Sequence, residues 1–211
     1  MSLFLLLALQ LPLDQTIRAI ETRYNRMETL KSNFTQLYRE DERATPREEA
    51  GVVYLKKPGR MRWEYTRPEV KLFVSDGKNV YFYVPADRQV TRMPAAESDD
   101  VRTPLRFLLG KLNLKRSFRK VEIAHDMAPL DPGNPVLHLL PKSRDERFRE
   151  MYLEVDQQYR IRRLVILETS GTKSEFRFFG EESNPPLDQA LFRFTVPPGV
   201  EVIDERQQAQ R

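Results

Sequence analysis

The fold is decided by two stretches of sequence, which read Gly51-Val-Val-Tyr-Leu-Lys-Lys-Pro-Gly-Arg-Met-Arg-Trp-Glu-Tyr65 and Leu72-Phe-Val-Ser-Asp-Gly-Lys-Asn-Val-Tyr-Phe-Tyr-Val84. Pro58-Gly59 divides the first stretch and Asp76-Gly77 divides the second, so each stretch contains two apolar runs with turn residues between them. An Asp-Gly pair between apolar runs is a strong signal for a tight β-hairpin, because such turns need residues that tolerate positive φ. The two stretches therefore predict four consecutive antiparallel strands.

Successive side chains between the two turns alternate between charged and apolar. The apolar residues are Met61, Trp63 and Tyr65, and the residues that separate them are charged. Because neighbouring side chains of a strand point to opposite faces, this strand should have one apolar, aromatic face and one charged face. We assign Leu72 and Val74 to the same apolar face. Apolar positions at this spacing usually form ordinary core, and they can also line a cavity for an apolar ligand.

Helices and further strands flank this centre. Residues 15–30 are predicted as an amphipathic helix after Asp14, because apolar residues recur at intervals of three and four. These residues are Ile17, Ile20, Tyr24, Met27 and Leu30. Residues 105–109 are predicted as a short helix, with Pro104 before them and Gly110 after them. Further strands are predicted over residues 32–39, 118–123, 136–140, 151–155, 161–167 and 175–179. This spacing is typical of an antiparallel sheet or barrel, so we predict a single domain over 14–206 and a frayed tail over 207–211.

The amino-terminal residues 1–13 are apolar and carry no charge before Asp14. A run of this length is too short to cross a bilayer, which needs about 20 apolar residues. Its length suits the apolar part of a signal peptide, although no basic residue precedes it and no small-x-small cleavage site follows. We predict a signal-peptide remnant, and the alternative is a hydrophobic lead into the first helix.

The charge of the chain is nearly balanced, with 35 Lys and Arg against 31 Asp and Glu and a net charge of +4. A nucleic-acid interface needs a basic stripe with stacking aromatic residues. The best basic run, Lys111 to Lys120, is more simply interpreted as a solvated face. We therefore predict no nucleic-acid partner.

The residue types needed for most catalytic and metal sites are scarce. The chain has no cysteine and two histidines, which excludes disulfides, thiolate ligands and a histidine-rich metal site. His138 lies in an apolar run with no carboxylate at ligand spacing, so we interpret it as structural. The acidic pairs Asp99-Asp100 and Glu181-Glu182 are interpreted as loop charges. Since no catalytic motif occurs either, we predict no enzyme activity, no metal and no cofactor.

Several short pieces together resemble one known family. They are Phe34-Thr-Gln36, Gly51-x-x-Tyr-x-Lys-Lys-Pro58, Met61-Arg-Trp-x-Tyr65-x-x-Pro68, Val74-Ser-Asp-Gly77, Tyr83-x-Pro85 with Gln89, and Phe192-x-Phe-Thr-x-Pro-Pro-Gly-Val200. In this order they resemble the LolA family of periplasmic carriers of outer-membrane lipoproteins. Each piece is weak alone, and together they cover most of the chain from Asp14 to Val202.

The resemblance implies both a fold and a function. The fold is mainly β with a few α-helices: an incomplete antiparallel β-barrel of about eleven strands, with short lid helices over a hydrophobic cavity. The function is to bind the acyl chains of lipoproteins in the periplasm. The cargo comes from an inner-membrane exporter and goes to an outer-membrane receptor, and the carrier is expected to be a monomer without a cofactor. The alternative is a regulatory or sensory lipid-binding domain of the same fold.

The resemblance also implies where the ligand binds. The residues expected to contact acyl chains are Met61, Trp63, Tyr65, Leu72, Val74, Phe107 and Leu108. Lys57 stands where the family often has an arginine linked to lid closure, so we expect it at the lid or the mouth of the cavity; the alternative is a solvated lysine. Lysine keeps the charge and loses the forked hydrogen bonding of arginine.

Overall fold

A computed structural model describes residues 13–41, 43–96, 104–142 and 148–204. The strands are β1 (Thr29–Arg39), β2 (Arg47–Lys56), β3 (Arg60–Arg67), β4 (Lys71–Asp76), β5 (Asn79–Val84), β6 (Gln89–Pro94), β7 (Lys120–Ile123), β8 (Val136–Leu140), β9 (Phe148–Val155), β10 (Ile161–Glu168), β11 (Lys173–Ser183) and β12 (Glu201–Asp204). The helices are α1 (Leu13–Asn25) and α2 (Leu114–Ser117), with the 3₁₀ helices η1 (Pro85–Asp87), η2 (Pro104–Leu109) and η3 (Gln189–Phe192). The predicted signal-peptide remnant, apart from Leu13, and the tail 207–211 lie outside the described residues. The single domain over 14–206 stays a prediction.

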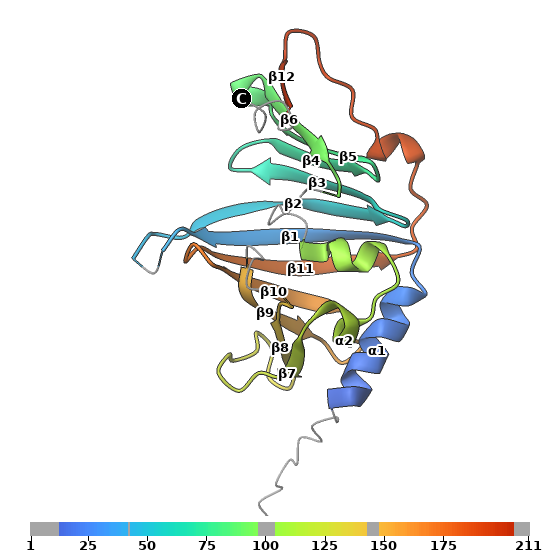
Figure 1. The fold of residues 1–211 in the computed structure, drawn as a ribbon, viewed down its shortest axis with the longest axis vertical. Helices are drawn as coiled ribbons and strands as arrows, with labels where there is room; N and C mark the ends of the chain where they lie inside the picture. Colours follow the sequence, from blue (N-terminus) through green and yellow to red (C-terminus); the bar gives the residue numbers. More distant parts are fainter. Residues whose placement is uncertain (1–12, 42, 97–103, 143–147, 205–211) are drawn as a thin grey trace, which may run out of the picture.

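All the strands of the described residues join one sheet in the order β12-β6-β5-β4-β3-β2-β1-β11-β10-β9-β8-β7. The central strand β1 pairs antiparallel with both β2 and β11, so the two halves of the chain meet along it (Figure 1). Both ends of this order are free edges, so the sheet is open. The predicted class, a mainly β incomplete barrel with short helices, is confirmed.

The strand β12 was not predicted, and the described residues form twelve strands where the family resemblance implied about eleven. It pairs with β6 in parallel, whereas the other strand pairs are antiparallel. Before reaching β6 the chain crosses β5, where the ring of Phe194 stacks on Tyr81 with the ring centroids 5.3 Å apart. Sequence periodicity could not reveal β12, because a strand of four residues is held mainly by its partner.

One face of the sheet, which we call the inner face, carries the main core. The helices α1 and η2 pack on this face, and their buried apolar residues belong to one cluster with those of the strands. In Figure 1, η2 crosses in front of β1 and β11, and α1 runs along the ends of β10 and β11. The predicted alternation in β3 is confirmed, since Met61, Trp63 and Tyr65 are buried in this cluster and the charged residues between them are not.

The register of the β3–β4 hairpin corrects the placement of Leu72 and Val74. Trp63 stands opposite Phe73, whereas Leu72 and Val74 stand opposite Glu64 and Arg62. Both residues therefore point to the outer face. Phe73, fully buried in the main cluster, is the apolar residue of β4 that belongs on the inner face. The error arose because three consecutive residues of β4 are apolar, so composition alone cannot say which of them face inward.

The first helix is shorter than predicted and ends at Asn25. Leu30 lies instead in β1, where buried residues alternate from Leu30 through Phe34. Leu30 satisfies both the helical spacing of the preceding residues and the alternation of the strand, which explains the overextended prediction. Asp14 lies within α1, and its carboxylate accepts a hydrogen bond from Lys115 Nζ at 2.7 Å.

Gly51 makes room for the aromatic residues of the inner face. A Cβ atom at this position would lie 1.9 Å from the carbonyl oxygen of Glu64 and 3.0 Å from a ring carbon of Phe34. Only glycine lets β3 and the ring of Phe34 approach so closely. The β2–β3 pairing also shifts by one residue at this point, between Ala50 and Gly51.

Candidate functional site

The centre of the inner face is a cluster of aromatic side chains from three strands. The ring of Phe34, on β1, lies edge-on to Trp63 with the centroids 4.7 Å apart and to Tyr65 with the centroids 5.0 Å apart. From β11, Phe176 and Phe178 approach Trp63 with centroid distances of 5.4 and 6.2 Å. The indole is fully buried. We call these five residues the aromatic cluster.

The two covering helices close over this cluster. Ile17, Ile20 and Tyr24 of α1 and Leu105 and Leu108 of η2 are buried in the same apolar cluster as Trp63. Leu108, one of the predicted acyl-chain residues, is 1% exposed. Phe107 lies in η2, but its side chain is outside what the structure describes. Apart from Tyr24, these buried side chains of the covers are aliphatic.

Two clefts flank the cluster, one at each end of the strands. A cleft of about 240 Å³ lies beside Met61 and is also lined by Gly59, Ser75, Val80 and Leu109. A second cleft of about 200 Å³ lies beside Tyr65, and its lining includes Gln36, Tyr38, Glu49 and Lys71. Trp63 lines neither cleft. Its indole packs against the rings of Phe34, Phe176 and Phe178, and a continuous cavity around Trp63 stays a prediction.

A broader cleft of about 580 Å³ lies along α1 and is remote from the aromatic cluster. Its lining includes Arg18 and Thr22 of α1 and Arg26 directly after the helix, and all three are exposed. We therefore place the candidate site on the inner face, where buried apolar side chains concentrate.

The turn between β2 and β3 contacts both covers. Lys57 Nζ donates a hydrogen bond of 2.6 Å to the carbonyl oxygen of Tyr24 in the last turn of α1. Two residues later, the N–H of Gly59 donates to the carbonyl oxygen of Leu109 at the end of η2, at 3.3 Å. A cation beside the carbonyl end of a helix is favourable, and partial burial lowers the pKa of Lys57. The turn therefore holds α1 and η2 through one hydrogen bond to each. The role of Lys57 in lid movement stays a prediction.

We expect the substitution Lys57→Met to loosen α1 without unfolding the protein. The aliphatic stem is kept and one hydrogen bond is lost, so stability should fall by about 1–2 kcal/mol. Amide hydrogen exchange in the last turn of α1 should become faster. The matched control is Lys56→Met, because Lys56 Nζ donates to the carbonyl oxygen of Leu187, away from both covers. Equal exchange in α1 for the two variants would remove Lys57 from the lid.

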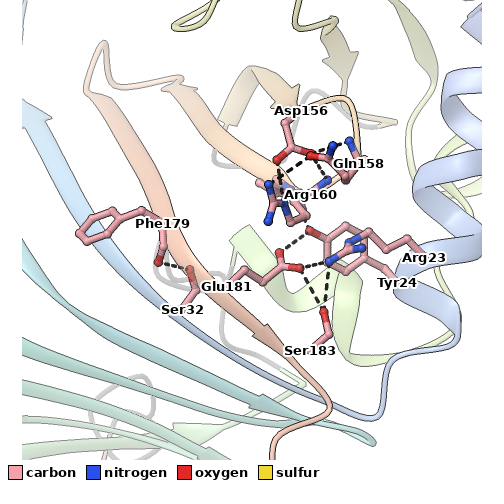
Figure 2. A network of polar contacts seen from close by, with 10 residues as sticks. Arg23, Tyr24, Ser32, Asp156, Gln158, Arg160, Phe179, Glu181 and Ser183 are labelled. Atoms are coloured by element: carbon pink, nitrogen blue, oxygen red, sulfur yellow. Dashed lines mark hydrogen bonds and ion pairs between the residues drawn. The ribbon is translucent and has the colours of Figure 1, made fainter.

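Glu181, in β11, also anchors α1 to the sheet. Its carboxylate accepts a hydrogen bond from Arg23 and another, of 2.9 Å, from the hydroxyl of Tyr24, as Figure 2 shows. The Tyr24 hydroxyl in turn accepts from the N–H of Ile161 at 2.8 Å. Burial, and next the charge of Glu181, raises the pKa of Tyr24 far above its usual range, so the phenol stays protonated. The helix is thereby joined to both β10 and β11.

The acidic pair at positions 181 and 182 was interpreted as loop charges, and this was wrong. Both residues lie in β11 and point to opposite faces. The side chain of Glu181 is 6% exposed against 53% for Glu182, which pairs with Lys31 at the surface. The pair Asp99-Asp100 lies outside the described residues.

His138 has carboxylate neighbours that its sequence spacing did not reveal. Its Nε2 lies 2.8 Å from Glu150 and its Nδ1 lies 3.3 Å from Glu122, and the ring stacks on Tyr152. These partners come from the adjacent strands β7 and β9. Within the described ranges, no group of three or more histidine, aspartate or glutamate residues could hold a metal ion.

Three members of the aromatic cluster were missing from the predicted acyl-chain residues, namely Phe34, Phe176 and Phe178. Phe34 and Phe176 stand between polar or charged residues and Phe178 follows Arg177, all inside strands that the sequence does predict. The alternation of these residues along their strands therefore already indicated that they share one face of the strand. It became usable only once the pairing of β1 with β11 placed the three rings beside Trp63.

Comparisons with known proteins now bear on this geometry. The family model described as "Outer membrane lipoprotein carrier protein LolA" matches residues 25–195. The chain belongs to the LolA family. Within this family, the "Outer-membrane lipoprotein carrier protein" of Azotobacter vinelandii is 32% identical over 91% of this chain and 89% of its own length. The protein of the same description from Nitrosomonas europaea is 28% identical over 89% of this chain and 88% of its own length.

A solved structure shares the fold of this chain. An uncharacterised conserved protein from Thermus thermophilus has a TM-score of 0.54 to this chain, at 16% identity, over 90% of this chain and 98% of its own length. At this identity the likeness concerns the fold alone. The resemblance found in the sequence is thus confirmed at the level of family and architecture.

Proposed function

We propose that this chain is a carrier that shelters the acyl chains of lipoproteins and moves the lipoproteins from the inner to the outer membrane. The observation that carries the proposal is the aromatic cluster, which lies between two clefts and beneath two small covers that are held partly by polar contacts. Membership of the LolA family, and the carrier names of the relatives, support a carrier over a sensory domain.

Loading would require the aromatic cluster to open. In the closed form the rings around Trp63 occupy the centre of the inner face. Acyl chains that enter must displace the covers and rearrange these rings, and the free energy of doing so offsets the gain from burying the chains. Such an offset is needed. Three chains of about fifteen methylenes would gain about 36 kcal/mol, well above the roughly 18–21 kcal/mol ceiling for non-covalent affinity. A cargo bound at that ceiling would not be released.

The proposed location is the periplasm, and the proposed partners are an inner-membrane exporter, an outer-membrane receptor and the acylated lipoproteins themselves. None of the helices that the structure describes is both long and apolar enough to cross a membrane. The proposed transfer involves binding and release, and it requires no catalytic step on this chain.

The proposal is tested by the fluorescence of Trp63, the only tryptophan of the chain. Lipopeptides that differ only in acyl-chain length are added to the purified protein. Since each buried methylene adds about 0.8 kcal/mol of affinity, the midpoint of the emission change should move to lower concentration as the chain lengthens. A response that is the same for short and long chains, or binding without any change in emission, would place the ligand elsewhere.

A further inference from the structure

Two buried polar groups of the inner face have no hydrogen-bond partner among the described residues. They are the indole N–H of Trp63 and the hydroxyl of Ser174, and both side chains belong to fully buried residues. Most buried polar groups in proteins are paired, because an unpaired one loses its bonds to water and gains nothing in return. These two groups therefore need an explanation.

Both groups belong to residues of the inner face, where we place the acyl chains. Ser174, Phe176 and Phe178 are the buried residues of β11 and alternate along its inner face. Phe176 lies 5.4 Å from Trp63 between ring centroids, and Ser174 is two residues further along the same strand. The strand pairing places Ser174 between Tyr38 of β1 and Ile166 of β10, and Ile166 belongs to the main cluster.

Packing alone does not account for an indole at position 63. The rings of Phe34, Phe176 and Phe178 surround it. The face of an aromatic ring is only a weak hydrogen-bond acceptor for the indole N–H. A phenylalanine would place an aromatic ring in the same wall without burying an N–H group. The indole therefore fits a protein in which a ligand brings an acceptor into this space.

The surroundings define the chemistry of that acceptor. A plain hydrocarbon chain has none. A carboxylate would bury a negative charge among phenylalanine rings, which is costly without a cation beside it. Two cations line the cleft beside Tyr65: Lys71 is already bound to Glu49, and Arg47 is exposed to water and pairs with Glu40. An ester carbonyl is neutral, accepts hydrogen bonds and is attached directly to an acyl chain.

We propose that the indole N–H of Trp63 donates a hydrogen bond to an ester carbonyl of an acylated glycerol, with the Ser174 hydroxyl as the second polar contact. The interior of this protein then selects ester-linked acyl chains over hydrocarbon chains of equal length. This inference rests on the proposed carrier function, and it names the chemical class of the bound group.

The test compares two lipids with the complete protein: a diacylglycerol and its dialkyl ether analogue with chains of the same length. Affinities are measured by displacement of a fluorescent fatty-acyl reporter. One net hydrogen bond corresponds to a preference for the ester of about fivefold. The variant Trp63→Phe should lose this preference, and Ser174→Ala should reduce it. The control Tyr54→Phe, which removes a hydroxyl from the outer face opposite Arg62, should keep it.

Each outcome separates the inference from the proposed function. Equal binding of the two lipids by the unsubstituted protein would overturn the inference and leave the carrier function standing. Binding of neither lipid would overturn both. A Trp63→Phe variant that folds and still prefers the ester would show that a group other than the indole donates the hydrogen bond to the carbonyl. If that variant does not fold, as judged by circular dichroism, the unsubstituted protein and Ser174→Ala decide the question.

Discussion

Replacement of Phe34 by alanine should lower the free energy of unfolding by about 4 kcal/mol. Phe34 is fully buried and its ring contacts both Trp63 and Tyr65, so its removal leaves a void at the centre of the aromatic cluster. Urea denaturation measures the change. The matched control is Phe179→Ala, because Phe179 is 45% exposed on the opposite face of the sheet, and there the change should stay within about 0.5 kcal/mol.

The same variant also tests how the site is used. Because a ligand that binds only the folded state stabilises it, a long-chain lipopeptide should raise the unfolding midpoint of Phe34→Ala as well as that of the unsubstituted protein. If Phe34→Ala costs no more than Phe179→Ala, the aromatic cluster is not packed as described. If it costs the expected amount but no lipid raises the midpoint of either protein, the cluster is ordinary core.

Removal of the Glu181 carboxylate should have the next largest effect. Glu181→Ala leaves the Tyr24 hydroxyl without its acceptor and leaves Arg23 with only the hydroxyl of Ser183, and breaking this largely buried pair should cost about 3 kcal/mol. The neighbouring variant Glu182→Ala removes an exposed partner of Lys31 and should cost at most about 0.5 kcal/mol.

Hydrogen exchange shows where that loss occurs. In Glu181→Ala the amides of α1 should exchange much faster, while those of β2 and β3 stay protected. In Glu182→Ala the exchange of α1 should be unchanged. Uniformly faster exchange over the whole sheet in Glu181→Ala would mean that Glu181 supports the fold in general and does not specifically hold α1.

The parts of the fold that depend on short sequence patterns could be predicted, and β3 is the clearest example. Its strict alternation identifies the inner face without any knowledge of the partners of the strand. In β4 the same reasoning failed for Leu72 and Val74, since Phe73 between them is also apolar and only the pairing with Trp63 decides which side faces inward. The register depends on how two strands pair, so it cannot be derived from the sequence of one strand.

The polar contacts of the site show the same limit. Glu181 meets Tyr24 across 157 positions of sequence, and His138 meets Glu150 from the adjacent strand. No local spacing relates such residues, because the fold alone brings them together. Lys57 was located through the family resemblance, which carries information from many chains that one sequence does not hold.

The burial of the aromatic cluster has a consequence for the carrier that we propose. Trp63 and the four other rings of the cluster cover one another, so the apolar wall is hidden from water. If the chain is the periplasmic carrier that we propose, its closed form should therefore bind neither of the two membranes nor other copies of the chain through this wall. The side chains that protect the closed form from unwanted association would then be the same ones that bind the acyl chains of the next lipoprotein.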